Sequence, residues 1–201
     1  MRLLNVNILE FGEFFDDDIP RYAILSHRWG KDEVTFLDFE SAKKGGPRFS
    51  KIRKFCNLAK EAYHAQWVWI DSCCIDKKSS AELSEARNSM FCWYEGASVC
   101  CVYLEAVMWT KDASGPSKSS LDRFRQSAWF AHGWTLQELL APENVSFYDR
   151  SWNFIGPKTS LSAKHSRCDR YQRKFCIESC FNHLFCNSCT KDELGVAETY
   201  Y

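Results

Sequence analysis

Short apolar segments alternate with stretches of helical periodicity, and this alternation limits the fold of the 201-residue chain more than any other feature. The apolar segments lie at residues 22–26, 67–75, 98–107 and 145–149. Strands that are apolar along their whole length are buried on both faces, which is typical of a parallel sheet covered by helices. We therefore predict an α/β fold with three layers, in which a mostly parallel sheet is flanked by helices.

Two amphipathic segments supply the main predicted helices. Before the second strand, apolar residues recur at helical spacing, namely Ile52, Cys56, Ala59 and Tyr63. After it, Ser79 and Glu82 have the spacing of a capping box, in which each side chain accepts a hydrogen bond from a free backbone N–H at the start of a helix. We expect that helix to end near Gly96.

Net charge and hydropathy exclude several classes of protein. Lysine and arginine together equal aspartate and glutamate at 26 each, so no overall field attracts nucleic acid or an anionic membrane. No segment is apolar over the length of a membrane span, and the first residues lack the pattern of a signal peptide. We therefore expect a cytoplasmic protein whose eleven cysteines are reduced. The adjacent pairs at 73–74 and 100–101 are interpreted as small core residues.

The composition changes after residue 161, and the last forty or so residues form a cysteine-rich tail. We predict a first domain over residues 1–161 and a tail over residues 162–201 that is not clearly part of the fold. The tail holds five candidate zinc ligands, Cys176, Cys180, His183, Cys186 and Cys189. Their pairs are closer together than in the usual zinc modules, and a mis-spliced or frameshifted terminus explains the change of composition more simply. We predict no metal site.

In sheets of this class, ligands bind outside the carboxyl ends of the strands. The first strand ends at Ser26, and Arg28 and Trp29 follow it in a loop, where Arg28 can bind a phosphate and Trp29 can stack on a base. In the alternative interpretation, His27 and Arg28 pair with a nearby acidic residue, Asp32 or Glu33, and Trp29 fills the core.

Asp71 lies at or near the carboxyl end of the second strand. A carboxylate at this position can hydrogen-bond to a ribose, as acidic residues at strand ends do in nucleotide-binding sheets. It can equally cap the helix that follows. With Asp76 nearby but no histidine at ligand spacing, the two carboxylates are weak evidence for a metal.

Three blocks of sequence carry a resemblance to a known family. They are "RYAILSHRWG" at 21–30, "WVWIDSCCIDK" at 67–77 and "GWTLQELLAP" at 133–142. Together with the start "MRLLNVNILEF" and the segment "SSAELSEARNSMFCWY", they closely resemble the fungal heterokaryon incompatibility (HET) domain over about residues 1–161. The resemblance implies an effector of cell death in fungal non-self recognition. It also implies protein partners, either a second copy of the chain or a nucleotide-binding receptor-type protein.

HET domains are distantly similar to TIR domains, which have a flavodoxin-like fold. "YAILSHRWG" resembles the first strand and loop of a TIR domain, and "WTLQEL" resembles its helix with a glutamate that is required for NAD cleavage in active members. By this resemblance Glu138 is the catalytic residue and NAD a possible substrate, with no cofactor required. The alternative is a non-catalytic module that assembles a cell-death complex. The family usually has arginine where this chain has His132, which cannot bind a phosphate bidentately.

The spacing of Glu138 allows two interpretations. Trp134 lies four residues earlier, so the two side chains share one helix face, and the indole can form a wall beside a working carboxylate. Such a carboxylate would bind the nicotinamide ribose or stabilise the positive charge that develops as the glycosidic bond breaks. Alternatively, Glu138 is a surface residue beside a core tryptophan.

Overall fold

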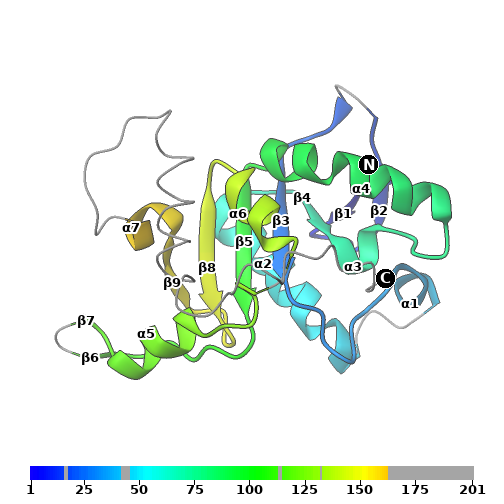
Figure 1. Ribbon diagram of the computed structural model, residues 1–201. Helices are drawn as coiled ribbons and strands as arrows, with labels where there is room; N and C mark the ends of the chain where they lie inside the picture. Colours follow the sequence, from blue (N-terminus) through cyan, green and yellow to red (C-terminus); the bar gives the residue numbers. More distant parts are fainter. Residues whose placement is uncertain (16–17, 42–45, 113–114, 132, 163–201) are drawn as a thin grey trace. The chain divides into compact units, whose positions relative to one another are not determined.

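A computed structural model describes residues 1–15, 18–41, 46–112, 115–131 and 133–162 (Figure 1). The chain divides into two units, Met1–Pro157 and Lys158–Tyr201, of which the second is described only in helix α7 (Lys158–Ser162). The cysteine-rich tail and its candidate zinc ligands lie outside the described residues. The domain boundary at residue 161 therefore stays a prediction.

A mixed sheet of seven strands forms the centre of the first unit. The strand order is β2 (Phe11–Glu13), β1 (Arg2–Asn5), β4 (Trp67–Ile70), β3 (Tyr22–His27), β5 (Val99–Leu104), β8 (Val145–Asp149) and β9 (Phe154–Pro157). The four central strands, β4, β3, β5 and β8, are parallel to their neighbours in this group. These are the four strands that the apolar segments predict, so the α/β class is confirmed.

The prediction of a mostly parallel sheet is wrong at the edges. β1 is antiparallel to both β4 and β2, and β9 is antiparallel to β8. For β9 the reason is connection length: a parallel neighbour requires a crossover of a dozen or more residues, whereas β8 and β9 are joined by residues 150–153. The second predicted strand is also shorter than expected, since the chain turns into the short helix α3 (Asp71–Cys74) directly after Ile70.

Helices cover both faces of the sheet. Tyr63 of α2 (Ser50–Tyr63) interacts with Cys101 of β5, and Tyr94 of α4 (Ser80–Gly96) lies near Cys100. Adjacent strand residues point to opposite faces, so α2 and α4 lie on opposite sides of the sheet. The short helix α6 (Thr135–Leu140) lies on the α4 side (Figure 1). The predicted three layers are present, and the paired cysteines are buried in the core as expected.

The remaining described elements are short and lie in the connections. They are α1 (Phe36–Ser41), the 3₁₀ turn η2 (Pro47–Phe49), the hairpin of β6 (Lys111–Asp112) with β7 (Gly115–Pro116), and α5 (Lys118–Arg125).

Half of the predicted capping box is present at the start of α4. The Ser79 side chain accepts a hydrogen bond from the Glu82 N–H at 3.3 Å. Glu82 does not return the bond to Ser79 but accepts one from the Asp76 N–H at 2.9 Å and binds the Arg2 guanidinium through both oxygens. The predicted cap therefore also attaches β1, the neighbour of the edge strand β2, to α4.

Asp149 organises the turn between β8 and β9. Its fully buried carboxylate accepts hydrogen bonds from the backbone N–H groups of Trp109, Ser151 and Asn153, at 2.8–3.0 Å. Within this turn Trp152 has a φ of 66°, a left-handed conformation that is unusual for a residue other than glycine, and its ring stacks on Tyr103 at 4.6 Å. The carboxylate therefore stabilises a turn that the backbone alone would not favour.

Replacing Asp149 by alanine is expected to lower the free energy of unfolding by about 3 kcal/mol, because one buried and two part-buried N–H groups would lose their acceptor. Urea denaturation of the full chain measures the effect. The control is Asp122→Ala, which removes an exposed aspartate 4.0 Å from Arg125 and should cost less than about 0.5 kcal/mol. Equal losses in the two variants would show that Asp149 does not hold the turn.

Candidate functional site

The side chain of Glu138 points into the fold and not into solvent. One carboxylate oxygen, Oε2, accepts a hydrogen bond from the Ser26 hydroxyl at 2.6 Å. The other, Oε1, accepts one from the Tyr94 hydroxyl at 3.2 Å. The carboxylate therefore lies between the carboxyl end of β3, the last turn of α4 and the first turns of α6. The catalytic role that the resemblance to TIR domains implies for this glutamate stays a prediction.

Ser26 is held by a second partner that the sequence does not reveal. The indole Nε1–H of Trp129 donates to the Ser26 hydroxyl oxygen at 2.8 Å, and both residues are almost completely buried. Trp129 lies in the connection between α5 and α6, 103 residues from Ser26. No local pattern marks it, since its role depends on a contact that forms only in the folded chain.

Burial is the main cause that raises the pKa of Glu138 to about 7. The negative charge of Asp71 also raises this pKa, while the hydrogen bonds from Ser26 and Tyr94 and the proximity of His27 lower it in part. A carboxyl group with this pKa changes its charge near neutral pH, which is the range in which a general acid or base works best. Perturbed carboxyl groups of this kind are concentrated at functional sites.

A second polar cluster lies on the other side of β3, because His27 points to the face opposite to that of Ser26. His27 Nε2 is 3.1 Å from a Glu33 oxygen, and the Lys51 ammonium is 2.5 Å from the other. Burial alone would raise the pKa of Glu33, but His27 and Lys51 lower it to about 2. Of the pairings considered for this loop, the one between His27 and Glu33 is therefore present.

Asp71 connects the ends of β3 and β4. One of its oxygens accepts a hydrogen bond from the Trp29 indole at 2.7 Å, and the other lies 3.8 Å from His27 Nδ1. The Lys77 ammonium lies over the Trp29 ring, and burial lowers the pKa of Lys77 to about 8. Asp71 thus contacts the loop after β3, and the structure shows no capping bond from it at the start of α3. Trp29 remains partly exposed and does not fill the core.

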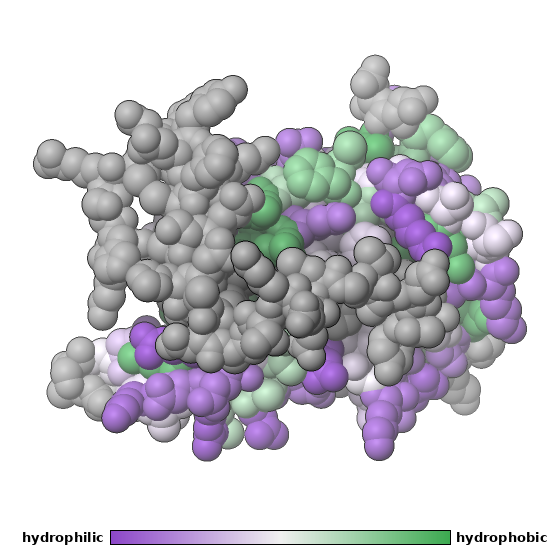
Figure 2. Space-filling view, in the orientation of Figure 1, coloured by the Kyte–Doolittle hydropathy of each residue, from purple (hydrophilic) through white to green (hydrophobic). Residues whose placement is uncertain are grey.

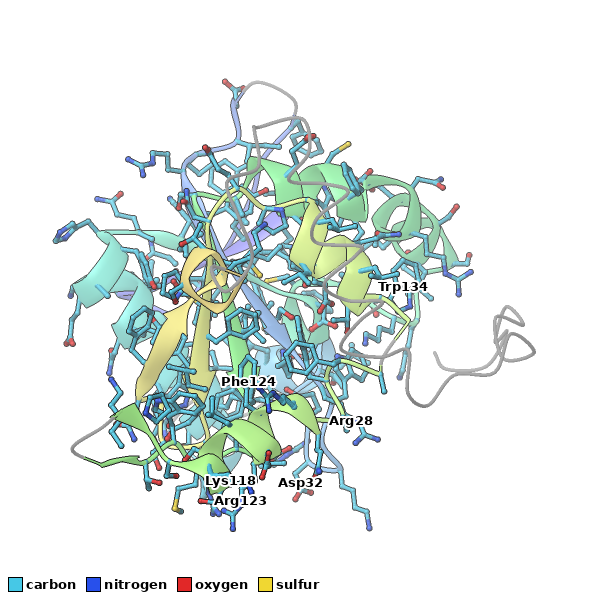
Figure 3. The ribbon with its side chains drawn as sticks, turned by 60° about the vertical axis from the view of Figure 1, so that its left-hand side comes forward. Arg28, Asp32, Lys118, Arg123, Phe124 and Trp134 are labelled. Atoms are coloured by element: carbon cyan, nitrogen blue, oxygen red, sulfur yellow. The ribbon has the colours of Figure 1, made fainter. Side chains whose placement is uncertain are left out.

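Arg28 and Trp134 are the two remaining predicted site residues. Arg28 is exposed and makes no hydrogen bond or ion pair with the described residues. Trp134 is half-buried and contacts Glu138 through its backbone, since its carbonyl accepts the Glu138 N–H at 3.3 Å. Figure 3 shows the two side chains apart, with Trp134 beside α6 and Arg28 nearer α5. The Trp134 ring therefore stays a predicted wall of the site, and His132 lies outside the described residues.

The structure brings together four of the six predicted site residues. Ser26 contacts Glu138, and Trp29 contacts Asp71. The two pairs interact electrostatically, because the negative charge of Asp71 raises the pKa of Glu138. Tyr94, Trp129 and His27 join them without having been predicted as site residues. A hollow lined by Arg2, Glu13, Glu82 and Trp93 lies elsewhere, and none of the predicted site residues lines it.

Neither a metal site nor a membrane-spanning helix is found in the described part of the chain. No group of three or more His, Cys, Asp or Glu side chains there is arranged to hold a metal ion. Among the same residues, no helix has the length and apolar character needed to cross a membrane.

The fold and the site define an α/β domain with a half-buried, hydrogen-bonded carboxylate at the carboxyl end of its central parallel strands. The family model for heterokaryon incompatibility protein (HET) matches residues 22–121, which include Ser26, Asp71 and Tyr94. The chain is also 45% identical over 148 residues to vegetative incompatibility protein HET-E-1 of Podospora anserina. It therefore belongs to the HET family, as the sequence blocks imply.

The match to HET-E-1 covers 71% of this chain but 11% of the relative. The chain thus spans about a tenth of the length of that protein. No solved structure matches the chain significantly.

The buried carboxyl group makes stability depend on pH. Because the pKa of Glu138 rises from 4.5 to about 7 on folding, the folded protein retains a proton that the unfolded chain releases. The resulting stabilisation is complete below pH 4.5 and is lost as the pH rises through 7. Between pH 5 and pH 8, the wild type is expected to lose about 2.5 kcal/mol more than Glu138→Gln. Urea unfolding at both pH values measures this difference, and an identical pH dependence would mean that the carboxylate is solvated.

Proposed function

We propose that this HET domain is an effector of heterokaryon incompatibility that acts in the cytoplasm and causes cell death by cleaving NAD. The observation that carries the proposal is the half-buried carboxylate of Glu138, which Ser26 and Tyr94 hold beside the loop that contains Trp29. The parallel arrangement of β4, β3, β5 and β8 supports a TIR-like or flavodoxin-like relation. In such sheets, ligands bind at the carboxyl ends of the strands, where these residues lie.

The proposed reaction is hydrolysis of the bond between nicotinamide and ribose. As this bond breaks, its electron pair moves to the pyridinium nitrogen, neutral nicotinamide leaves, and positive charge develops on the ribose. A fixed carboxylate in a site poor in water stabilises such a charge strongly. Water then adds its hydroxyl group to the ribose carbon and releases a proton, which gives ADP-ribose. The reaction needs no metal and no further cofactor.

The neighbouring residues supply plausible contacts for the rest of the substrate. The exposed part of the Trp29 ring can stack on a planar ring, and Asp71 can hydrogen-bond to a ribose hydroxyl. The guanidinium of Arg28 has no partner among the described residues and is available for a phosphate. Direct contact of Ser26 with the ligand stays a prediction, because its hydroxyl is bonded to Glu138 in this state.

The purified full chain, clustered artificially, is expected to release nicotinamide from NAD. Glu138→Gln keeps the shape of the side chain but removes its charge, and should lower the rate at least about 100-fold. The matched control is Glu143→Gln, which changes an exposed glutamate five residues away and should leave the rate unchanged. Liquid chromatography of nicotinamide and ADP-ribose measures all three. Intact NAD after incubation with the clustered wild type, or equal rates for Glu138→Gln, would refute NAD cleavage.

A second candidate function is the assembly of a cell-death or non-self-recognition complex without catalysis. Both oxygens of Glu138 already accept hydrogen bonds from the protein, as they would in a purely structural role. On the same side of the sheet, the outer surfaces of α4 and α6 expose Phe91 and Leu136, the latter by 50%. Figure 2 shows hydrophobic residues where these helices reach the surface. Such a surface suits a second copy of the chain or a nucleotide-binding receptor-type protein.

If α6 forms the contact between copies, Leu136→Asp should abolish self-association, because a charge would be buried in an apolar interface. Light scattering of the full chain over a range of concentrations measures the mass. Ile8→Asp, which changes a comparably exposed apolar residue on a different element, is expected to leave the mass unchanged. Assembly through this surface is ruled out if the wild type stays monomeric, or if both variants have the same effect.

A further inference from the structure

The direction of the hydrogen bonds around Ser26 follows from the chemistry of its partners. The indole N–H of Trp129 can only donate, so the Ser26 oxygen accepts it. An ionised Glu138 can only accept, so the one hydroxyl proton of Ser26 must point at Glu138. Trp129 therefore fixes the orientation of the hydroxyl group that contacts the carboxylate.

Tyr94 supplies the second fixed donor. Burial and the negative charge of Glu138 raise the pKa of Tyr94 well above its ordinary value, so its hydroxyl stays protonated and donates to Oε1. The Tyr94 ring packs edge-on against Trp69 at 6.0 Å, on the sheet itself. The two carboxylate oxygens are therefore held by donors from two different elements, β3 and α4.

Trp129 is itself held by the helix that carries Glu138. The Thr135 hydroxyl, in the first turn of α6, donates to the Trp129 carbonyl at 2.6 Å. The Trp129 ring makes edge-on contacts with Phe130 at 5.0 Å and Phe147 at 5.9 Å. Glu138 of α6 thus binds Ser26, Ser26 binds Trp129, and Trp129 binds Thr135, which also belongs to α6.

We propose that Ser26, Tyr94 and Trp129 are positioning residues that hold the Glu138 carboxylate in one orientation and favour its charged form. In this role they act on a ligand through Glu138. Among the described residues, the other titratable groups that act on this carboxyl group are Asp71 from α3, which raises its pKa, and His27 from β3, which lowers it. The inference rests on the proposed NAD cleavage for its catalytic consequence, but the positioning itself can be measured without substrate.

The test is a carbon-13 NMR titration of the Glu138 carboxyl group in the full chain, assigned by its loss in Glu138→Gln. Ser26→Ala and Tyr94→Phe each remove one donor and should raise the titration midpoint by about one pH unit. Ser26→Thr keeps the hydroxyl and should restore the wild-type midpoint. Trp129→Phe should raise it by a smaller amount, because the hydroxyl remains but loses its fixed orientation.

The matched control is Ser146→Ala, which removes a buried serine hydroxyl on the opposite face of the sheet and should not move the midpoint. If Ser26→Ala does not fold, Tyr94→Phe and Trp129→Phe decide the outcome. Midpoints that equal the wild-type value in the folded variants would overturn the inference.

Activity distinguishes the failure of this inference from the failure of NAD cleavage. If the wild type cleaves NAD, the acidic limb of its pH profile should shift upward in Ser26→Ala by the same amount as the NMR midpoint. If the wild type leaves NAD intact, the catalytic proposal is wrong, and the titration alone decides the positioning. Cleavage with an unshifted profile and midpoint in every folded variant would remove the positioning role while NAD cleavage remains.

Discussion

The hydrogen bond between Ser26 and Glu138 is the interaction on which the candidate site depends. It joins residues 112 positions apart, at the end of a strand that is buried along its whole length. A serine in such a strand would lose stability if its hydroxyl had no partner, since a buried polar group is costly when unpaired. The Ser26 hydroxyl accepts a hydrogen bond from Trp129 and donates one to Glu138. These two bonds fix α6 against the central strands and place the carboxylate at their carboxyl ends.

The charges around this bond are only partly balanced, and this contributes to the raised pKa of Glu138. Glu138 and Asp71 repel each other, whereas Glu33 is neutralised by His27 and Lys51. On the opposite face of the sheet, Glu33 lies between His27 and Lys51, and Tyr63 shares a hydrogen bond with Tyr148 at 2.6 Å. A carboxyl group that changes charge near neutral pH suits catalysis, but it is also a source of instability that a purely structural core would avoid.

The sequence predicts the central layer well, because apolar runs such as residues 22–26 have one stable place in a covered parallel sheet. It does not predict β1, β2 and β9, which are short outer strands with mixed burial and no clear period. Glu138 was identified by resemblance, since its spacing from Trp134 fits a surface helix equally well. Trp129 could not be found at all, because its role arises from a contact across 103 residues that no local pattern encodes.

The central claim is that the Glu138 carboxylate is held within the fold by its hydrogen bonds to Ser26 and Tyr94. Carbodiimide labelling of carboxyl groups in the full chain, followed by peptide mass spectrometry, tests it directly. Glu138 should react at least about ten times more slowly than Glu143, which is exposed on the neighbouring loop, because the reagent reaches only solvated carboxyl groups. Equal labelling of the two glutamates in the folded protein would contradict the account.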